Sequence, residues 1–243
     1  SFMSFFFRTE YNYKDLYYAE VAARTDASSR FGKDHRWGAF WSLGFMWNIK
    51  NEAFLKDVEW LTGAQIKLST GTSGNSTIPD YDHLALVSGN ANYLDQAGLF
   101  PLRSGNEELG WEQTWANNIG LSVGLFNRVN VNFDFYHKKT TNMLMFVPQS
   151  YAISGESGHW DNIGAMMNRG VEVAVDGDVI RTRDFTWNLS ANFSYNKNKL
   201  LELYNGVEEY VNSTTGLKYV VGHSVHEYFM NRYAGVNPAN GDA

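Results

Sequence analysis

The chain has 243 residues, which is long enough to bury a sizeable core, and its formal net charge is −6. That acidic balance argues against a general nucleic-acid-binding protein, so no nucleic-acid partner is expected. Aromatic residues reach 16% while charged residues make up only 19%, which excludes collagen, a coiled coil and a charged disordered tail. The absence of cysteine excludes a disulfide framework and a cysteine-ligated zinc site.

The hydropathy of the chain excludes one kind of membrane protein and leaves another open. The chain is hydrophilic on average, with a mean hydropathy of −0.37, in spite of its many aromatic residues. The sequence contains no apolar run of about 18 residues, which excludes a transmembrane helix. A transmembrane β-barrel stays open, because its strands carry apolar residues only at alternate positions.

Alternation of apolar and polar residues dominates the sequence and predicts β-strands. In residues 185–196 every odd position is apolar or aromatic, and every even position is Thr, Asn or Ser. The one helical signal is short and lies in residues 52–61. In chain order the predicted strands are 5–13, 17–24, 37–49, 64–70, 119–125, 129–136, 171–176, 185–196 and 225–233.

The connections between these strands alternate in length. Short turns follow strands one, five and seven, and the link after strand three is intermediate. Long polar segments follow strands two, four, six and eight, at residues 26–36, 71–110, 140–169 and 197–224. An antiparallel meander of this kind has small turns at one end and large loops at the other, as outer-membrane barrels do. A soluble β-sandwich with the aromatic residues inside is the alternative, because a half-buried sheet shows the same alternation.

Two sets of residues have different roles in these two architectures. Aromatic residues at predicted strand ends suit the two interfacial girdles of a membrane barrel. The polar positions of 130–134 and 188–196, which are rich in Asn, are expected to point the same way. They would form the wet face of a soluble protein, or line a hydrated lumen or contact a plug in a large barrel. The girdle candidates are Tyr11, Tyr13, Trp37, Phe185, Trp187 and Tyr195.

The sequence carries no motif of a known catalytic site. The nucleophile elbow, the P-loop, the zinc-protease motif and the dinucleotide fingerprint are all missing. Asp80 with Asp82, or Glu107 with Glu108, could imitate the two carboxylates of a glycosidase. Both pairs lie in long polar loops, where acidic residues are ordinary. We therefore expect no enzymatic activity, no cofactor and no metal site.

A series of short phrases runs in order along nearly the whole chain. Examples are YNYKDLY at 11–17, LGWEQT at 109–114, NRGVE at 168–172 and AGVNP at 234–238. The order and spacing of these phrases resemble the barrel of the SusC/RagA-like family, which are TonB-dependent outer-membrane transporters of Bacteroidetes. The other matching phrases lie at 24–32, 37–47, 52–58, 71–75, 124–127, 135–141, 162–164 and 185–199.

The resemblance implies an all-β fold, an antiparallel up-and-down transmembrane β-barrel of 22 strands with an N-terminal plug. About nine strands and little helix are predicted in this chain. Residues 1–243 are therefore expected to form an internal piece of such a barrel, without the plug domain, the signal peptide or the C-terminal strand. An isolated piece would have two unpaired edges.

The resemblance also implies a function in the outer membrane. The expected role is import of a nutrient such as a glycan or a peptide, with a SusD-like surface lipoprotein as partner and energy supplied by TonB through the plug. This chain would contribute barrel wall against outer-membrane lipid. Tyr81, Tyr93, Tyr151 and Trp160 are predicted to contact substrate or the partner lipoprotein, although packing of loops against one another is the plainer interpretation. A soluble or surface carbohydrate-binding β module and a small-barrel adhesin are the alternative functions.

Overall fold

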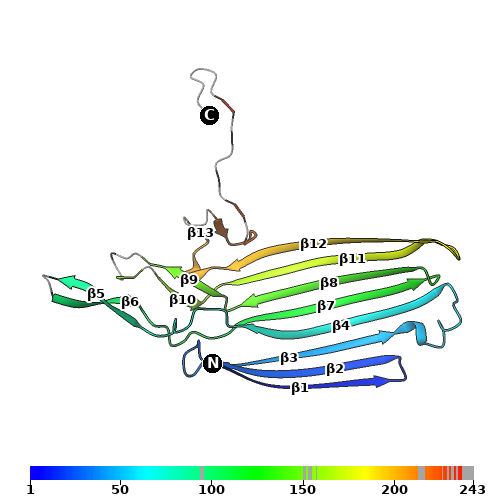
Figure 1. The fold of residues 1–243 in the computed structure, drawn as a ribbon, viewed down its shortest axis with the longest axis horizontal. Coiled ribbons are helices and arrows are strands. Elements are labelled where there is room, and N and C mark those ends of the chain that lie inside the picture. Colours follow the sequence, from blue (N-terminus) through cyan, green and yellow to red (C-terminus); the bar gives the residue numbers. More distant parts are fainter. Residues whose placement is uncertain are drawn as a thin grey trace.

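The main body of the protein is one antiparallel sheet of eight strands, as the computed structural model shows (Figure 1). The structure describes residues 1–93, 96–149, 152, 155–156, 158–212, 217–225, 227–228, 230, 233 and 235–236. Neighbouring strands follow one another in chain order, apart from inserted hairpins. The sheet strands are β1 (Phe2–Tyr13), β2 (Tyr17–Ser28), β3 (Trp37–Asn48), β4 (Leu61–Asn75), β7 (Glu112–Leu125), β8 (Val129–Thr141), β11 (Ala165–Arg181) and β12 (Thr186–Glu202).

Three small hairpins lie outside this sheet and at the same end of it (Figure 1). The first two interrupt the long connections between β4 and β7 and between β8 and β11, and the third follows β12. They are formed by β5 (Leu86–Tyr93) with β6 (Gln96–Arg103), β9 (Leu144–Pro148) with β10 (Gly158–Asn162), and β13 (Glu209–Asn212) with β14 (Leu217–Val220).

The opposite end of the sheet carries tight turns. Lys14 and Asp15 both have positive φ values, of 53° and 56°, and Phe126 and Asn127 repeat the pattern with 56° and 52°. Two consecutive left-handed residues make the hairpin turn whose twist matches that of antiparallel strands. The predicted asymmetry between a turn end and a loop end is therefore confirmed, and both names are used below in this sense.

The all-β antiparallel fold and the first eight predicted strands are confirmed. The sheet is open, since among the described residues no pairing joins β1 to β12, as expected for part of a larger barrel. The ninth predicted strand, 225–233, lies partly outside the described residues. Within its described part, Tyr228 forms an isolated bridge with Leu217, so a ninth sheet strand stays a prediction.

The short helix predicted in residues 52–61 is not present, and a series of turns takes its place. A 3-10 helix, η1 (Ile49–Asn51), precedes these turns. The Lys50 ammonium donates to the carbonyls of Leu55, Lys56 and Val58 at 2.9, 3.1 and 2.7 Å. These bonds wrap the segment around one side chain instead of a helical hydrogen-bond ladder. In the part of the chain that the structure describes, no helix is long and apolar enough to cross a membrane.

The two faces of the sheet differ sharply in chemistry because the register keeps the alternation in phase. One row crosses all eight strands through Tyr11, Ala19, Phe45, Leu68, Ile119, Phe135, Val171 and Tyr195. The adjacent row, on the other face, runs through Glu10, Glu20, Gly44, Ser69, Asn118, Tyr136, Gly170 and Asn196. A shift of one residue in any pairing would mix these two faces.

We name the two faces by the side chains that they carry. The apolar face holds the odd-numbered positions of seven strands: β1, β2, β3, β7, β8, β11 and β12. In β11 this applies up to Gly177, and in β12 up to Lys199. In β4 the apolar face holds the even-numbered positions from Ala64 on. The opposite positions of the same strands form the polar wall. The predicted common direction of the Asn-rich positions in β8 and β12 is confirmed, because both sets lie on the polar wall.

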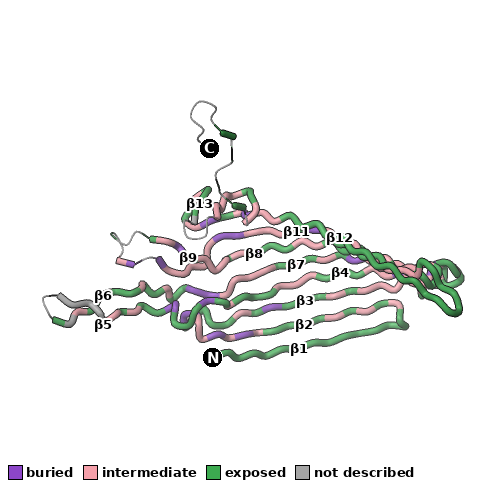
Figure 2. Tube along the Cα trace, turned by 45° about the horizontal axis from the view of Figure 1, so that its top comes forward, coloured by how far each residue is buried: buried purple, intermediate pink, exposed green. Residues whose placement is uncertain are grey.

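Most buried residues lie at the loop end of the sheet, although Leu61 and Ala64 at the start of β4 are buried near the turn end (Figure 2). Phe31, Ile78 and Leu109 form a small core at the loop end, with Trp111, Leu144 and Trp160 packed against it. On the apolar face, by contrast, Phe7 and Phe193 are 61% and 63% exposed. A β-sandwich would bury this face under a second sheet. An exposed apolar surface that extends over eight strands needs another apolar medium or partner to cover it.

Candidate functional site: the polar wall and its loop-end hollow

The polar wall is held together by hydrogen bonds between side chains of neighbouring strands. Ser122 of β7 donates to Asn132 of β8 at 2.7 Å, and the Tyr136 hydroxyl reaches across β11 to Asn196 of β12 at 3.1 Å. Asn130 donates to Asp176 of β11 at 3.1 Å. These amides and hydroxyls retain further donors and acceptors for water or for protein that faces the wall.

Two glycines let large polar side chains lie flat on the wall. A Cβ at Gly170 would come within 2.6 Å of the Tyr136 hydroxyl oxygen, and one at Gly120 within 2.6 Å of an Asp134 oxygen. Because the rows are so close, only glycine leaves room for these two side chains. A hollow of about 460 Å³ remains beside them, bounded by Asn118, Lys138, Asn168, Glu172 and Asn196 with Asp134 and Tyr136.

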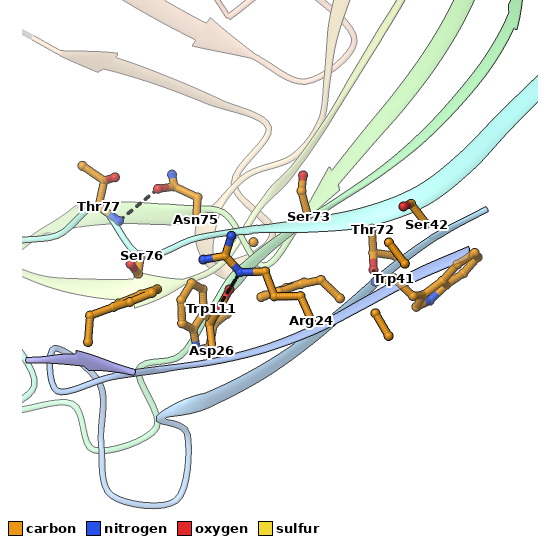
Figure 3. Close-up of a pocket in the computed structure, with 15 residues that line it drawn as sticks. Arg24, Asp26, Trp41, Ser42, Thr72, Ser73, Asn75, Ser76, Thr77 and Trp111 are labelled. Carbon is orange, nitrogen blue, oxygen red and sulfur yellow. Dashed lines mark hydrogen bonds and ion pairs between the residues drawn. The ribbon is translucent and has the colours of Figure 1, made fainter. Parts of the chain in front are cut away.

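A second hollow, of about 500 Å³, lies at the loop end of the wall (Figure 3). It opens where β3 and β4 part, because their regular pairing ends at Ser42 and Gly71. Beyond that point a single bond links the two strands, from the Trp41 backbone N–H to the Thr72 hydroxyl at 3.2 Å. The hollow therefore forms because the hydrogen-bonded pairing of β3 and β4 stops before either strand reaches its loop end.

The lining of the loop-end hollow combines one ion pair with aromatic rings. The Arg24 guanidinium lies 2.7 Å from the Asp26 carboxylate, which is only 4% exposed (Figure 3). The rings of Phe40 and Trp111 contact each other edge to face, with centroids 5.4 Å apart. Hydroxyl and amide groups of β4 complete the lining. Such a surface can stack on a planar or sugar-like group and hydrogen-bond to its polar edge.

The small core beneath this hollow fixes the position of Trp111. The ring of Trp111 lies 5.3 Å from that of Phe31, and its indole N–H donates to the Arg36 carbonyl at 2.9 Å. Gly32 permits this docking, because a Cβ there would lie 1.7 Å from the Glu107 carbonyl oxygen. The segment after β2 thus packs tightly on the segment before β7, and Trp111 is held in place from two sides.

Charged groups in the long loops act as links between loop segments. Asp80 pairs with Arg30 at 2.9 Å, and Asp82 forms an ion pair with Arg103. The two acids are therefore each engaged with a separate cation. In the part of the chain that the structure describes, no group of three or more His, Asp and Glu residues is arranged to hold a metal ion.

Glu156 is a buried carboxylate that links the two loop hairpins. It is 3% exposed and accepts a hydrogen bond from the Ser104 backbone N–H. Burial raises the pKa of Glu156, but the bonds from Ser104 and the nearby His159 and Arg103 outweigh burial, so the pKa lies below its ordinary 4.5. The charged form is thus the one that the folded loops favour.

The lowered pKa of Glu156 predicts acid-sensitive loops. A carboxyl whose folded pKa is depressed contributes full stability above its unfolded pKa and loses that contribution as the pH falls through the folded pKa. The protection factor of the Ser104 amide, the ratio of its intrinsic hydrogen-exchange rate to the observed rate at the same pH, should therefore fall below about pH 4.5. In Glu156→Gln this protection factor should be low at both pH 7 and pH 4, whereas Glu108→Gln, at an exposed loop position, should behave like the parent. A high, pH-independent protection factor in Glu156→Gln would contradict this role.

The four aromatic residues predicted to contact substrate lie in different surroundings. Tyr81 is 65% exposed on a loop turn, where its carbonyl accepts a bond from Arg103. Trp160 belongs to β10 and packs against the small core, with its ring 6.1 Å from that of Phe146. Tyr93 ends β5, and its side chain lies outside the description, as does the whole of Tyr151. A role in binding stays a prediction for all four.

Few features of the sequence indicate the loop-end hollow. Arg24 and Asp26 occupy alternate positions of one strand, which was the available signal that they share a face. Phe40 and Trp111 are 71 positions apart in the chain by their numbers, and their contact depends on tertiary packing. Sequence reasoning therefore missed this site.

One apolar and one polar face on a long antiparallel meander define a wall segment of a large β-barrel. The family model "TonB dependent receptor-like, beta-barrel" matches residues 1–239. The chain belongs to this family, which agrees with the resemblance drawn from its short phrases.

Individual relatives support the same assignment. The chain is 38% identical over 201 residues to TonB-dependent receptor P39 of Formosa agariphila, covering 82% of this chain and 19% of that protein. It is 33% identical to TonB-dependent receptor SusC of Bacteroides thetaiotaomicron, covering 98% of this chain and 26% of that protein. The solved structure of the RagAB peptide transporter superposes with a TM-score of 0.90 at 37% identity, over 97% of this chain and 26% of that one. The chain thus spans about a fifth to a quarter of the length of these relatives.

Proposed function

We propose that residues 1–243 are part of the wall of a larger outer-membrane barrel, and that the whole protein imports a nutrient. The observation that carries this proposal is the unbroken apolar row across all eight strands, backed by an equally continuous polar row. Lipid would cover the first and the barrel interior would face the second. Two relatives of known class, each about four times as long as this chain, support the same conclusion.

The dimensions of the apolar face fit a lipid bilayer. On β12 the apolar stretch runs from Trp187 to Tyr195, and the β8 positions that match its part from Leu189 to Tyr195 run from Val129 to Phe135. Strands of about ten residues rise roughly 33 Å and span an apolar band of about 25 Å when tilted near 45°. Trp47 and Trp187 near the turn end, with Trp37 near the loop end, suit interfacial girdles.

The substrate and partners follow from the relatives and from the hollow at the loop end. RagAB is described as a peptide transporter, which supports a peptide as one substrate class. The aromatic rings and the ion pair of the hollow suit a glycan equally well. A SusD-like surface lipoprotein would close the loop end, and TonB would supply energy through a plug inside the barrel. Tyr81, Tyr93, Tyr151 and Trp160 remain our proposed contacts with substrate or lipoprotein.

Uptake by whole cells tests this function. Deletion of the gene should abolish TonB-dependent uptake of one labelled oligosaccharide or oligopeptide from a panel, and a plasmid copy should restore it. The protein itself should fractionate with the outer membrane. Unchanged uptake of every compound in the panel, together with a soluble protein, would favour the carbohydrate-binding module instead.

A further inference from the structure

The charged side chains on the apolar face share one sign and one location. Among all positions of this face in the eight strands, none is Asp or Glu. The basic residues all lie at the loop end of three adjacent strands, β8, β11 and β12. We call this set the basic rim; it consists of His137, Lys139, Arg169, Lys197 and Lys199.

The register places the basic rim in two consecutive rows. His137, Arg169 and Lys197 lie directly opposite one another, and Lys139 and Lys199 flank Met167 in the next row. The first of these rows follows the apolar row of Phe135, Val171 and Tyr195. Neighbouring strands are about 4.8 Å apart, so the rim covers roughly 10 Å across the sheet. Its groups are therefore close enough to bind one anionic group together.

The basic rim is exposed and its charge is not neutralised by the protein. Lys139, Arg169 and Lys197 are exposed, and His137 and Lys199 are half-buried. The described residues offer none of the five an ion pair, whereas Arg8 and Arg24 on the polar wall both pair with acids. Cations gathered so closely repel one another unless an anion from outside compensates them.

We propose that the basic rim binds the phosphate-bearing headgroup of a lipid in the membrane leaflet at the loop end. The proposal rests on the function proposed above, since it needs lipid against the apolar face. The acyl chains would lie on the apolar rows while the phosphate meets the rim. Arg169, at the centre, can hold two phosphate oxygens at once, and the lysines add point charges on either side. Charge complementarity at the edge of an apolar band therefore selects a lipid anion.

Native mass spectrometry of the full-length barrel in detergent tests this inference. The probe is monophosphoryl lipid A, compared with the same lipid without its phosphate, and inorganic phosphate serves as a free competitor. Arg169→Gln with Lys197→Gln removes the centre of the rim. Lys14→Gln with Arg183→Gln removes the same charge at the turn end and is the matched control.

The rim variant should bind the phosphorylated lipid about 25-fold more weakly, since each basic residue near an anionic surface contributes about fivefold. The control should change binding less than twofold, and inorganic phosphate should not displace the lipid. The proposal would be overturned if both variants weakened lipid binding equally, or if the parent bound the lipid with and without phosphate equally well. The basic rim would then consist only of side chains that extend from the apolar face to water. Uptake and heat-modifiable migration in gels should stay normal in the rim variant. Unchanged uptake in the gene-deletion strain, with lipid binding by the parent and the rim variant as predicted here, would instead count against the proposed transport function alone.

Discussion

Arginine in place of Leu121 should destabilise the inserted barrel by about 2 to 4 kcal/mol, the cost of a cation at the lipid face near the middle of the bilayer. Leu121 lies on the apolar face of β7, directly between Ile66 of β4 and Phe133 of β8. No acidic residue shares that face to compensate the new charge. Reversible unfolding of the full-length barrel by urea in lipid vesicles gives the free energy of unfolding.

The adjacent residue provides the control for this substitution. Ser122 lies on the polar wall, where it pairs with Gln65 and Asn132. Ser122→Arg loses the hydrogen bond to Asn132 and the exposed one from Lys67, but it keeps its charge in water, so its cost should be about 1 kcal/mol. If the two variants were destabilised equally, or if Ser122→Arg were the worse, the assignment of the two faces would be wrong.

Phe31→Ala is expected to destabilise the packing of the long loops by about 3 to 5 kcal/mol, the usual cost of truncating a buried aromatic residue. Phe31 has 0% exposure, and it packs on Ile78, Leu109 and Trp111 from separate loop segments. Because this small core lies outside the sheet, the loss of stability should be confined to the long loops. Proteolysis within residues 29–36 and 104–111 should accelerate, while hydrogen exchange in β7 and β8 stays slow.

Phe54→Ala is the matched substitution for the loop core. Phe54 is 68% exposed in the connection between β3 and β4, so its removal creates no cavity. Its proteolysis pattern should match that of the parent. Equal protection of residues 29–36 in Phe31→Ala and in the parent would show that the small core does not hold the loops.

The strands could be predicted because each one meets two different environments. Where one face is apolar and the other polar, alternation appears in the sequence, as in β12 from Trp187 to Tyr195. It fades where both faces are polar: β7 begins at Glu112, yet only its part from Ile119 on alternates clearly. The existence of the eight sheet strands was therefore predictable, but their lengths were not, and the six strands of the loop hairpins were not predicted.

The remaining features depend on contacts between distant parts of the chain. The turns at 52–61 result from one lysine that binds three carbonyls, which local propensity does not register. The loop-end hollow exists because the β3–β4 ladder ends at Ser42 and Gly71, a point without a signature in either strand. Trp160 could be named as a loop aromatic, but its packing against the small core depends on residues that lie far from it in the chain.

The central claim, that one face of this sheet meets lipid and the other meets the barrel interior, can be measured along a single strand. Residues 1–243 contain no cysteine, so single cysteines at 129–136 can carry a nitroxide label without competition from this chain. In the full-length barrel in lipid vesicles, oxygen, which concentrates in lipid, should speed the spin relaxation of the nitroxide most at Val129, Val131, Phe133 and Phe135. Relaxation by a water-soluble nickel complex should peak at Asn130, Asn132, Asp134 and Tyr136. A loss of the two-residue period, or the opposite phase, would contradict this account of the protein.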